Sequence, residues 1–79
     1  ELNRVLKKAF EAQLPKGRSG RELKIRYAVQ IASEPPLIRL FSDRDEPLHF
    51  AFERFLQNRL REKWDLAGVP LKFVVRKGE

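Results

Sequence analysis

Lysine and arginine side chains, which bind phosphate groups, are the residues of this chain with the clearest capacity for recognition chemistry. There are 17 of them against 11 aspartates and glutamates, so the formal net charge is +6. A positive balance favours an acidic partner, with nucleic acid as the leading candidate. A basic surface that only aids solubility is the alternative, and composition does not separate the two. The candidates for nucleic-acid contact are Lys16, Arg18, Arg21, Lys24, Arg26, Arg39, Lys72 and Arg76.

The segment 16–21 concentrates three of these cations around two glycines. Backbone amides in glycine-rich turns approach phosphates closely. Gly17 to Gly20 also spells GxxG, the motif with which KH domains clamp a nucleic-acid backbone. That clamp joins two helices, whereas this segment follows a helix and precedes a strand. We therefore interpret it as a basic loop that touches nucleic acid and not as a KH clamp.

No arrangement typical of catalysis or of metal binding occurs in the sequence. The chain has no cysteine and one histidine, His49, whose neighbouring carboxylates would have to complete a metal site from a single short segment. Asp43, Asp45 and Glu46 are better explained by capping than by acid–base catalysis. GxxxxGK[ST] and GxSxG motifs are also absent. We expect no catalytic residue, no metal and no cofactor.

The elements that position the cations follow from hydrophobic periodicity. Apolar residues recur at helical spacing over residues 1–13, and Pro15 ends that helix. From residue 23 the period changes to two, which is typical of a half-buried strand, with Leu23, Ile25, Tyr27, Val29 and Ile31 directed towards the helices. Pro35 and Pro36 form a connection, and residues 37–41 form a second strand antiparallel to the first.

A second helix and a third strand complete the chain. Asp45 is the expected N-cap of a helix that runs to about Trp64 and ends before Gly68. Residues 71–76 alternate between apolar and cationic side chains and form the last strand. The order α-β-β-α-β predicts an α+β fold, a three-stranded sheet with two helices packed on one face. We predict a single domain over residues 1–79 with no membrane span.

The face of the sheet away from the helices is the main candidate surface. Alternation sends Lys24 and Arg26 outward from the first strand and Lys72 and Arg76 outward from the third. Arg39 joins them if Ile38 and Leu40 point inward. Phe41 and Val74 lie among these cations, which makes the face suitable for binding phosphates or for docking a partner. An ordinary solvated face is the equal alternative, because strand patterning alone produces one.

Two residues of the second helix have two interpretations each. Arg59 falls inside the apolar sector, where it forms an inter-element pair or directs its charge outward to solvent. Phe50 lands on the polar side, where it meets a partner or packs on the first helix. Phe41, Phe50, Arg59 and Val74 are therefore the candidates for contact with another domain.

Several segments together resemble one known family. They are Glu1–Arg4, the strand Leu23–Gln30, Pro35–Pro36, Leu48–Phe50, Phe55–Glu62 and Gly68–Leu71. In order and spacing they are similar to the C-terminal KH-like domain of the Der (EngA) tandem GTPases. Val29 stands where that family often has threonine, which is a β-branched exchange. The resemblance covers nearly the whole chain.

The resemblance implies a KH-like fold that lacks the helix–GxxG–helix element. It also implies a non-catalytic module of a cytoplasmic GTPase that acts in maturation of the large ribosomal subunit. Its expected partners are ribosomal RNA and the GTPase domains of the same protein, through which it transmits the nucleotide state. The alternative is a purely regulatory protein–protein domain without RNA contact. We expect a monomer that neither binds nor hydrolyses GTP through this domain.

Overall fold

A computed structural model describes residues 1–66 and 68–78 of the chain. Two helices and three strands follow one another in the predicted order α-β-β-α-β, so the α+β KH-like fold class is confirmed. The elements are α1 (Leu2–Ala12), β1 (Ile25–Ser33), β2 (Pro36–Ser42), α2 (Phe50–Trp64) and β3 (Lys72–Lys77).

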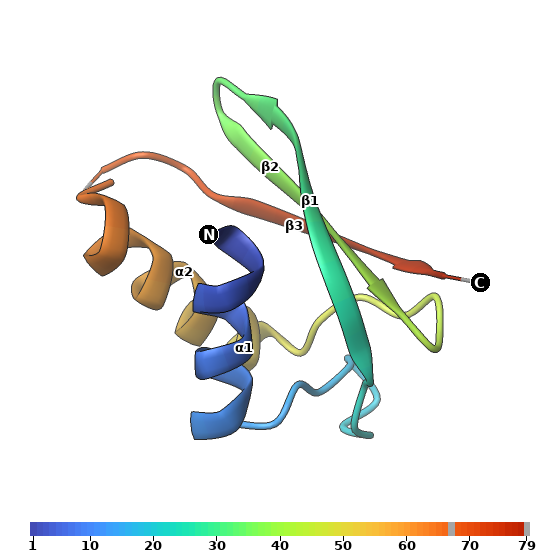
Figure 1. Ribbon diagram of the computed structural model, residues 1–79. Coiled ribbons are helices and arrows are strands. Elements are labelled where there is room, and N and C mark those ends of the chain that lie inside the picture. Colours follow the sequence, from blue (N-terminus) through green and yellow to red (C-terminus); the bar gives the residue numbers. More distant parts are fainter. Residues whose placement is uncertain (67, 79) are drawn as a thin grey trace.

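The three strands form a mixed sheet with β2 in the centre. β1 pairs with β2 in antiparallel orientation, as predicted, and β3 pairs with the other edge of β2 in parallel orientation. Both helices lie on the same side of this sheet (Figure 1). The core fills the space between the two layers. Its buried apolar side chains are Leu6, Ala9, Leu23, Ala28, Ile38, Leu40, Leu48, Phe52, Leu56, Leu60 and Leu71.

Helix α1 is attached to the edge of the sheet by an asparagine. Leu6 and Ala9, three residues apart, face the core from α1. On the same helix the amide group of Asn3 bonds both backbone groups of Ala28 in β1, accepting from its N–H at 2.7 Å and donating to its carbonyl at 3.0 Å. The side chain thus replaces a neighbouring strand at one point of the β1 edge.

The N-cap of helix α2 lies four residues later in the chain than predicted. Its N-cap is His49, whose Nδ1 accepts a hydrogen bond from the amide of Ala51 at 3.2 Å. The prediction of Asp45 in this role is wrong, because the Asp45 carboxylate accepts from the backbone amide of Lys77 at 2.7 Å instead. The end at Trp64 is as predicted, and Asp65 takes the left-handed conformation with φ 54°.

Strand β1 departs from strict alternation because its pairing with β2 is irregular. The register shifts between Ile25 and Tyr27, so an extra residue, Arg26, is accommodated there. Beyond this bulge the inward position belongs to Ala28, which is buried. The prediction that Tyr27, Val29 and Ile31 face the helices is therefore wrong, and these side chains are 50%, 42% and 40% exposed.

Strands β2 and β3 follow the predicted alternation. Ile38 and Leu40 are buried, and Phe73 and Val75 pack against the core. The segment between α2 and β3 is held by two side chains of α2. Gln57 donates to the carbonyl of Leu71, and Arg61 donates to the carbonyl of Val69. Neither helix, within the described part of the chain, is long and apolar enough to cross a lipid bilayer.

Candidate interaction surfaces

The side of the sheet that the helices leave uncovered combines apolar and cationic side chains. The strand register forms two complete rows on this side, one of Tyr27, Phe41 and Arg76 and one of Val29, Arg39 and Val74. Leu37 of β2 and Lys72 of β3 are paired beyond the second row. We call this surface the open face and define it by Tyr27, Val29, Leu37, Arg39, Phe41, Lys72, Val74 and Arg76.

An aromatic pair occupies one end of the open face. The rings of Tyr27 and Phe41 are stacked, with centroids 4.6 Å apart and planes at 21°. Aromatic pairs on neighbouring strands stabilise a sheet. Tyr27 is nevertheless half-exposed, and tyrosine exposed in this way is common at the centre of protein interfaces. The bulge at Arg26 produces this pair, because it turns Tyr27 to the side of the sheet where Phe41 lies.

Arg39 lies at the centre of the open face and has an unsatisfied donor. It is flanked by Val29 on β1 and Val74 on β3. Its Nε is buried and has no hydrogen-bond partner among the described residues. A buried donor without an acceptor is costly. Arg39 as a whole is half-buried, so an acceptor on a docked partner would reach this Nε only after the side chain moves.

The three cations of the open face have no acidic side chain beside them on the strands. None of the residues in β1, β2 or β3 is an aspartate or glutamate. Lys72 and Arg76 lie on β3 with exposed side chains, and Arg39 is half-buried. Asp45 and Glu46, from the turn before α2, nevertheless line a pocket with Val74 and Arg76. The open face thus combines apolar side chains with three cations, which suits a carboxylate-bearing protein or a nucleic acid.

The four cations predicted to share this surface do not come together. Lys72 and Arg76 belong to the open face, but Lys24 precedes β1 and lies near Asp43, which accepts from its amide at 3.1 Å. Arg26 lies in the bulge and lines a groove with Asn3 and Lys7 of α1. The predicted common surface is therefore wrong for Arg26, because the bulge interrupts the alternation on which it depends. Lys24 precedes the bulge, and its place on this surface stays a prediction.

The backbone amides of the basic loop already have acceptors. Gly17 donates to the carbonyl of Arg21 at 2.9 Å, Gly20 to the carbonyl of Gly17 at 2.9 Å, and Arg18 to the carbonyl of Pro47 at 2.8 Å. The amide of Ser19 donates to the carboxylate of Glu46 at 2.6 Å. The expectation that these amides approach a phosphate is wrong in this structure, because a carboxylate of the chain itself holds the position of the anion.

The three carboxylates of the turn at residues 43–46 each accept a hydrogen bond from a backbone amide in another segment. Asp43 accepts from Lys24, Asp45 from Lys77 and Glu46 from Ser19. Arg44 strengthens the arrangement, since its Nε donates to Glu46 at 3.3 Å and its Nη2 donates to the carbonyl of Glu22 at 2.9 Å. The prediction that these carboxylates cap α2 is therefore wrong, because the amides they bind belong to the loop, to the residue before β1 and to β3.

The pKa values of two of these carboxylates are lowered by their donors. For Glu46 the main causes are hydrogen bonds from Ser19, through its hydroxyl and then its amide, and Arg44 acts in the same direction. For Asp43 the main cause is the hydrogen bond from the Lys24 amide, and the charges of Arg44 and Lys24 contribute. Both carboxylates are therefore anionic at neutral pH and serve structural contacts.

Phe50 and Arg59, the remaining candidates, both lie on exposed parts of α2. Phe50 is 72% exposed and stacks on His49 at 4.7 Å. Packing of Phe50 on α1 is thus wrong, because it is the first residue of α2 and its side chain faces solvent. Arg59 extends outward, with its guanidinium 5.0 Å from the centre of the Phe55 ring.

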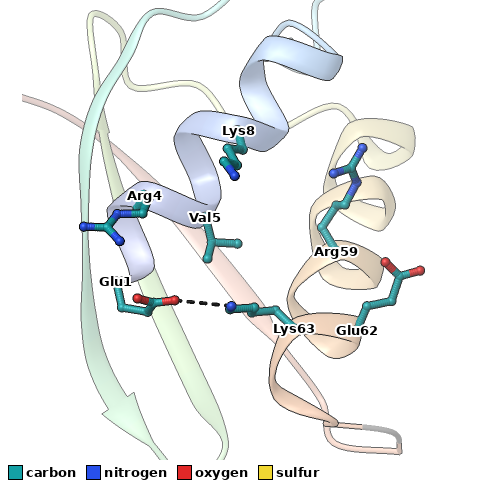
Figure 2. A pocket seen from close by; sticks show the side chains of 7 residues that line it. All are labelled: Glu1, Arg4, Val5, Lys8, Arg59, Glu62 and Lys63. Carbon is teal, nitrogen blue, oxygen red and sulfur yellow. Dashed lines mark ion pairs between the residues drawn. The ribbon is translucent and has the colours of Figure 1, made fainter.

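A groove between the two helices carries a second group of cations (Figure 2). We call it the helix groove and define it by its lining residues, which are Glu1, Arg4, Val5, Lys8, Arg59, Glu62 and Lys63. Of its four cations, sequence reasoning singled out only Arg59 as a contact residue. The pairs Arg4 and Lys8, and Arg59 and Lys63, are each one helical turn apart, which is a readable signal. Figure 2 shows Lys8 and Arg59 on facing sides of the groove and Arg4 directed away from α2, an arrangement that depends on how α1 packs against α2.

The described residues offer two candidate surfaces, the open face of the sheet and the helix groove. Within residues 1–66 and 68–78, no group of three histidine, aspartate or glutamate side chains is placed to hold a metal ion. Two helices against one side of a three-stranded sheet, with the other side open and basic, define an α+β binding module of the KH-like class.

Comparison with known proteins gives the family. The family model described as the KH-domain-like region at the C-terminus of EngA bacterial GTPase enzymes matches residues 1–76. This chain belongs to that family, and its domain is the non-catalytic part of such proteins, whose GTPase activity resides in other domains.

Curated relatives agree with the family match. GTPase Der of Leuconostoc mesenteroides is 40% identical over 75 residues, which cover 95% of this chain and 17% of the relative. GTPase Der of Geobacter metallireducens is 40% identical over 76 residues, or 96% of this chain and 17% of the relative. GTPase Der of Chlorobaculum tepidum is 44% identical over 70 residues, or 89% and 16%. The chain thus spans about a sixth of the length of these relatives.

Proposed function

We propose that this domain couples a GTPase to the assembling large ribosomal subunit in the cytoplasm. In this proposal the open face packs on a GTPase domain of the same protein, and cationic surface of the domain binds ribosomal RNA. The nucleotide state then controls ribosome association, because each state packs differently on the KH-like domain. Such control requires that the partner bind the two states with different affinities.

The unsatisfied Arg39 within an exposed apolar sheet is the observation that supports docking. Val29 flanks it on β1 and Tyr27 lies in the next row, with side chains that are 42% and 50% exposed. Its Nε has no acceptor among the described residues. Protein interfaces combine these features, since tyrosine and arginine surrounded by apolar contacts supply most of the binding energy. A carboxylate or carbonyl of the GTPase domain would pair with Arg39.

Site-specific thiol labelling of the full-length protein tests the docking. The domain has no cysteine of its own, so Val29→Cys introduces one thiol on the open face and Lys7→Cys a matched thiol on α1. We expect slower labelling of Val29→Cys with GDP than with a non-hydrolysable GTP analogue, or the reverse, and equal labelling of Lys7→Cys in both. Equally fast labelling of both thiols in every state would refute the docking.

Cosedimentation with precursors of the large subunit tests the RNA contact. Phosphate contacts release counterions, so the association should weaken steeply between low and physiological salt. Association that does not depend on salt, or none at all, would remove RNA from the proposal.

A regulatory domain that contacts only protein is the second candidate. The observation that favours it is the basic loop, whose backbone amides from Gly17 to Gly20 already have acceptors within the chain. In that case the open face still docks and the thiol-labelling result is unchanged. The salt series separates the two candidates, because only the first predicts a steep dependence.

A further inference from the structure

We propose that the helix groove is the binding site for the phosphate backbone of RNA, on the side of the domain opposite the open face. This inference rests on the proposed function for the identity of the partner. It adds the place where the RNA binds and the consequence that RNA and a GTPase domain can be held together.

The two ends of the groove differ in their charge balance. At one end Glu1 and Lys63 form an ion pair with a distance of 3.5 Å between their charged atoms. At the other end Lys8 of α1 and Arg59 of α2 lie on facing sides of the groove, and the carboxylate of Glu62 points away from α1 (Figure 2). One end is thus neutralised within the chain, and the other end presents two like charges to each other.

Neither cation at the second end has an anionic partner in the described part of the chain. Lys8 takes part in none of the ion pairs there, and Arg59 contacts only the face of the Phe55 ring, 5.0 Å from its centre. Stacking on a ring leaves the edge of a guanidinium, with its N–H donors, available. An anion placed between the two side chains relieves their repulsion and is bound from both sides.

The spacing of the cations matches a chain of phosphates better than a single anion. Arg4 and Lys8 on α1, and Arg59 and Lys63 on α2, are each separated by four residues, or about 6 Å along the helix. Neighbouring phosphates of a nucleic-acid strand have a separation of the same order. Within the groove such a strand meets Lys8 from α1 and Arg59 from α2, because Arg4 is directed away from α2 and Lys63 is paired with Glu1 (Figure 2).

The chemistry of the lining residues predicts contact with the backbone and not with bases. The groove contains four cations, two carboxylates and the aliphatic side chain of Val5, and no aromatic ring lines it. Base recognition in single strands depends on stacking against aromatic rings. The expected binding is therefore independent of sequence and strongly dependent on salt.

The position of the groove allows two partners at once. The helices lie on one side of the sheet and the open face on the other (Figure 1). A GTPase domain on the open face therefore does not cover Lys8 or Arg59. If RNA binds at the groove, the nucleotide state must control ribosome association in a way other than by covering the RNA site with a GTPase domain.

The test compares two double variants of the full-length protein. Lys8→Gln with Arg59→Gln removes the two facing cations, and Lys7→Gln with Arg54→Gln removes the same charge from the same helices outside the groove. Binding of labelled polyuridylate and of purified ribosomal RNA is measured over a salt series. Each phosphate contact contributes about 0.7 to the logarithmic salt slope of a single strand.

We expect the groove variant to lower the salt slope by about 1.4, which corresponds to roughly tenfold weaker binding at ~0.15 M salt. The control variant should weaken binding less than about twofold, because its charges act only at long range. Lys8→Arg with Arg59→Lys keeps the charges and should restore binding, which excludes a loss of folding as the cause.

Three results would overturn the inference, and they are distinguishable. Equal loss in the groove and control variants means that only net charge matters. Unchanged RNA binding combined with altered thiol labelling at position 29 assigns the groove to a protein partner, while the coupling function survives. Absence of RNA binding by the unaltered protein removes the RNA part of the proposed function and the groove site together.

Discussion

The open face and the basic loop were both predicted to contact an acidic partner, but the polar groups of the loop have hydrogen-bond acceptors within the chain and Arg39 Nε on the open face has none among the described residues. In the loop each amide from Gly17 to Gly20 donates to a carbonyl or to the carboxylate of Glu46. On the open face the Nε of Arg39 has no acceptor among the described residues and Tyr27 is half-exposed. Both regions are cationic, but only one has groups that a partner would satisfy. Unpaired groups are a better guide to a contact surface than charge.

The largest effect is expected from Arg39→Glu in the full-length protein, because it places an unpaired carboxylate in the middle of the docked face. Interface residues of this kind are worth about 2 kcal/mol or more, roughly a 30-fold change in the docking equilibrium. The measurement is the labelling rate of Val29→Cys, which should rise by that factor in the docked state. Arg54→Glu, on the exposed side of α2, is the matched control and should leave the rate unchanged.

The loop is expected to respond through stability. A Cβ at position 17 would collide with the carboxylate group of Glu46, so Gly17→Ala must displace that side chain from the Ser19 amide. Loss of this charge-assisted bond should lower the free energy of unfolding, which urea denaturation measures.

A double-mutant cycle identifies the cause of that loss. In a Glu46→Ala background the same glycine substitution should be close to neutral, because the colliding side chain is gone. An equally large loss in both backgrounds would place the effect in the backbone of the loop, and Glu46 would not be the internal anion.

Acid should weaken the loop and leave the open face unaffected. The pKa values of Glu46 and Asp43 are lowered from 4.5 and 3.8 by their hydrogen bonds. The unfolded chain therefore binds protons first as the pH falls, and the free energy of unfolding decreases below about pH 4.5 and continues to fall through the folded-state pKa values. Glu46→Gln should make the free energy of unfolding depend less on pH just below about pH 4.5, as measured by urea denaturation at successive pH values. An identical pH profile for the variant would contradict the assignment.

The smallest effect is expected from the loop cations. Replacement of Lys16, Arg18 and Arg21 by glutamine should weaken RNA binding by less than about twofold, because nearby carboxylates already oppose their potential and screening limits its range. The same salt series used for the helix groove measures it. A loss as large as that of Lys8→Gln with Arg59→Gln would return the RNA site to the loop.

Much of the architecture was predictable because it depends on local periodicity. The bounds of α1 and the end of α2 agree with the prediction to within one or two residues, and Ile38 and Leu40 point inward as expected. The start of α2 was not predictable in the same way. Asp45 is a good N-cap by type, but its carboxylate is engaged by the Lys77 amide from the other end of the chain. Long-range partners of this kind leave no trace in a local pattern.

The candidate surfaces were predictable in part. Arg39, Phe41, Lys72, Val74 and Arg76 lie on one face because β2 and β3 keep strict alternation. On β1 one extra residue at Arg26 turns Tyr27 outward onto Phe41. A bulge of one residue changes the hydrophobic pattern too little to be recognised in advance. It changes which side of the sheet the side chains from Tyr27 to Gln30 occupy, up to a second register shift between Gln30 and Ala32.

The sequence by itself determined the order of elements, the basic character and the family, because these depend on periodicity, composition and residue identity along the chain. Only the tertiary structure decided which cations remain free for a partner. Three features join residues distant in sequence: the register of β1 on β2, the packing of α1 beside α2, and the hydrogen bond from the Ser19 amide to Glu46. Charge is a property of a residue, whereas an unpaired charge is a property of its neighbours in space.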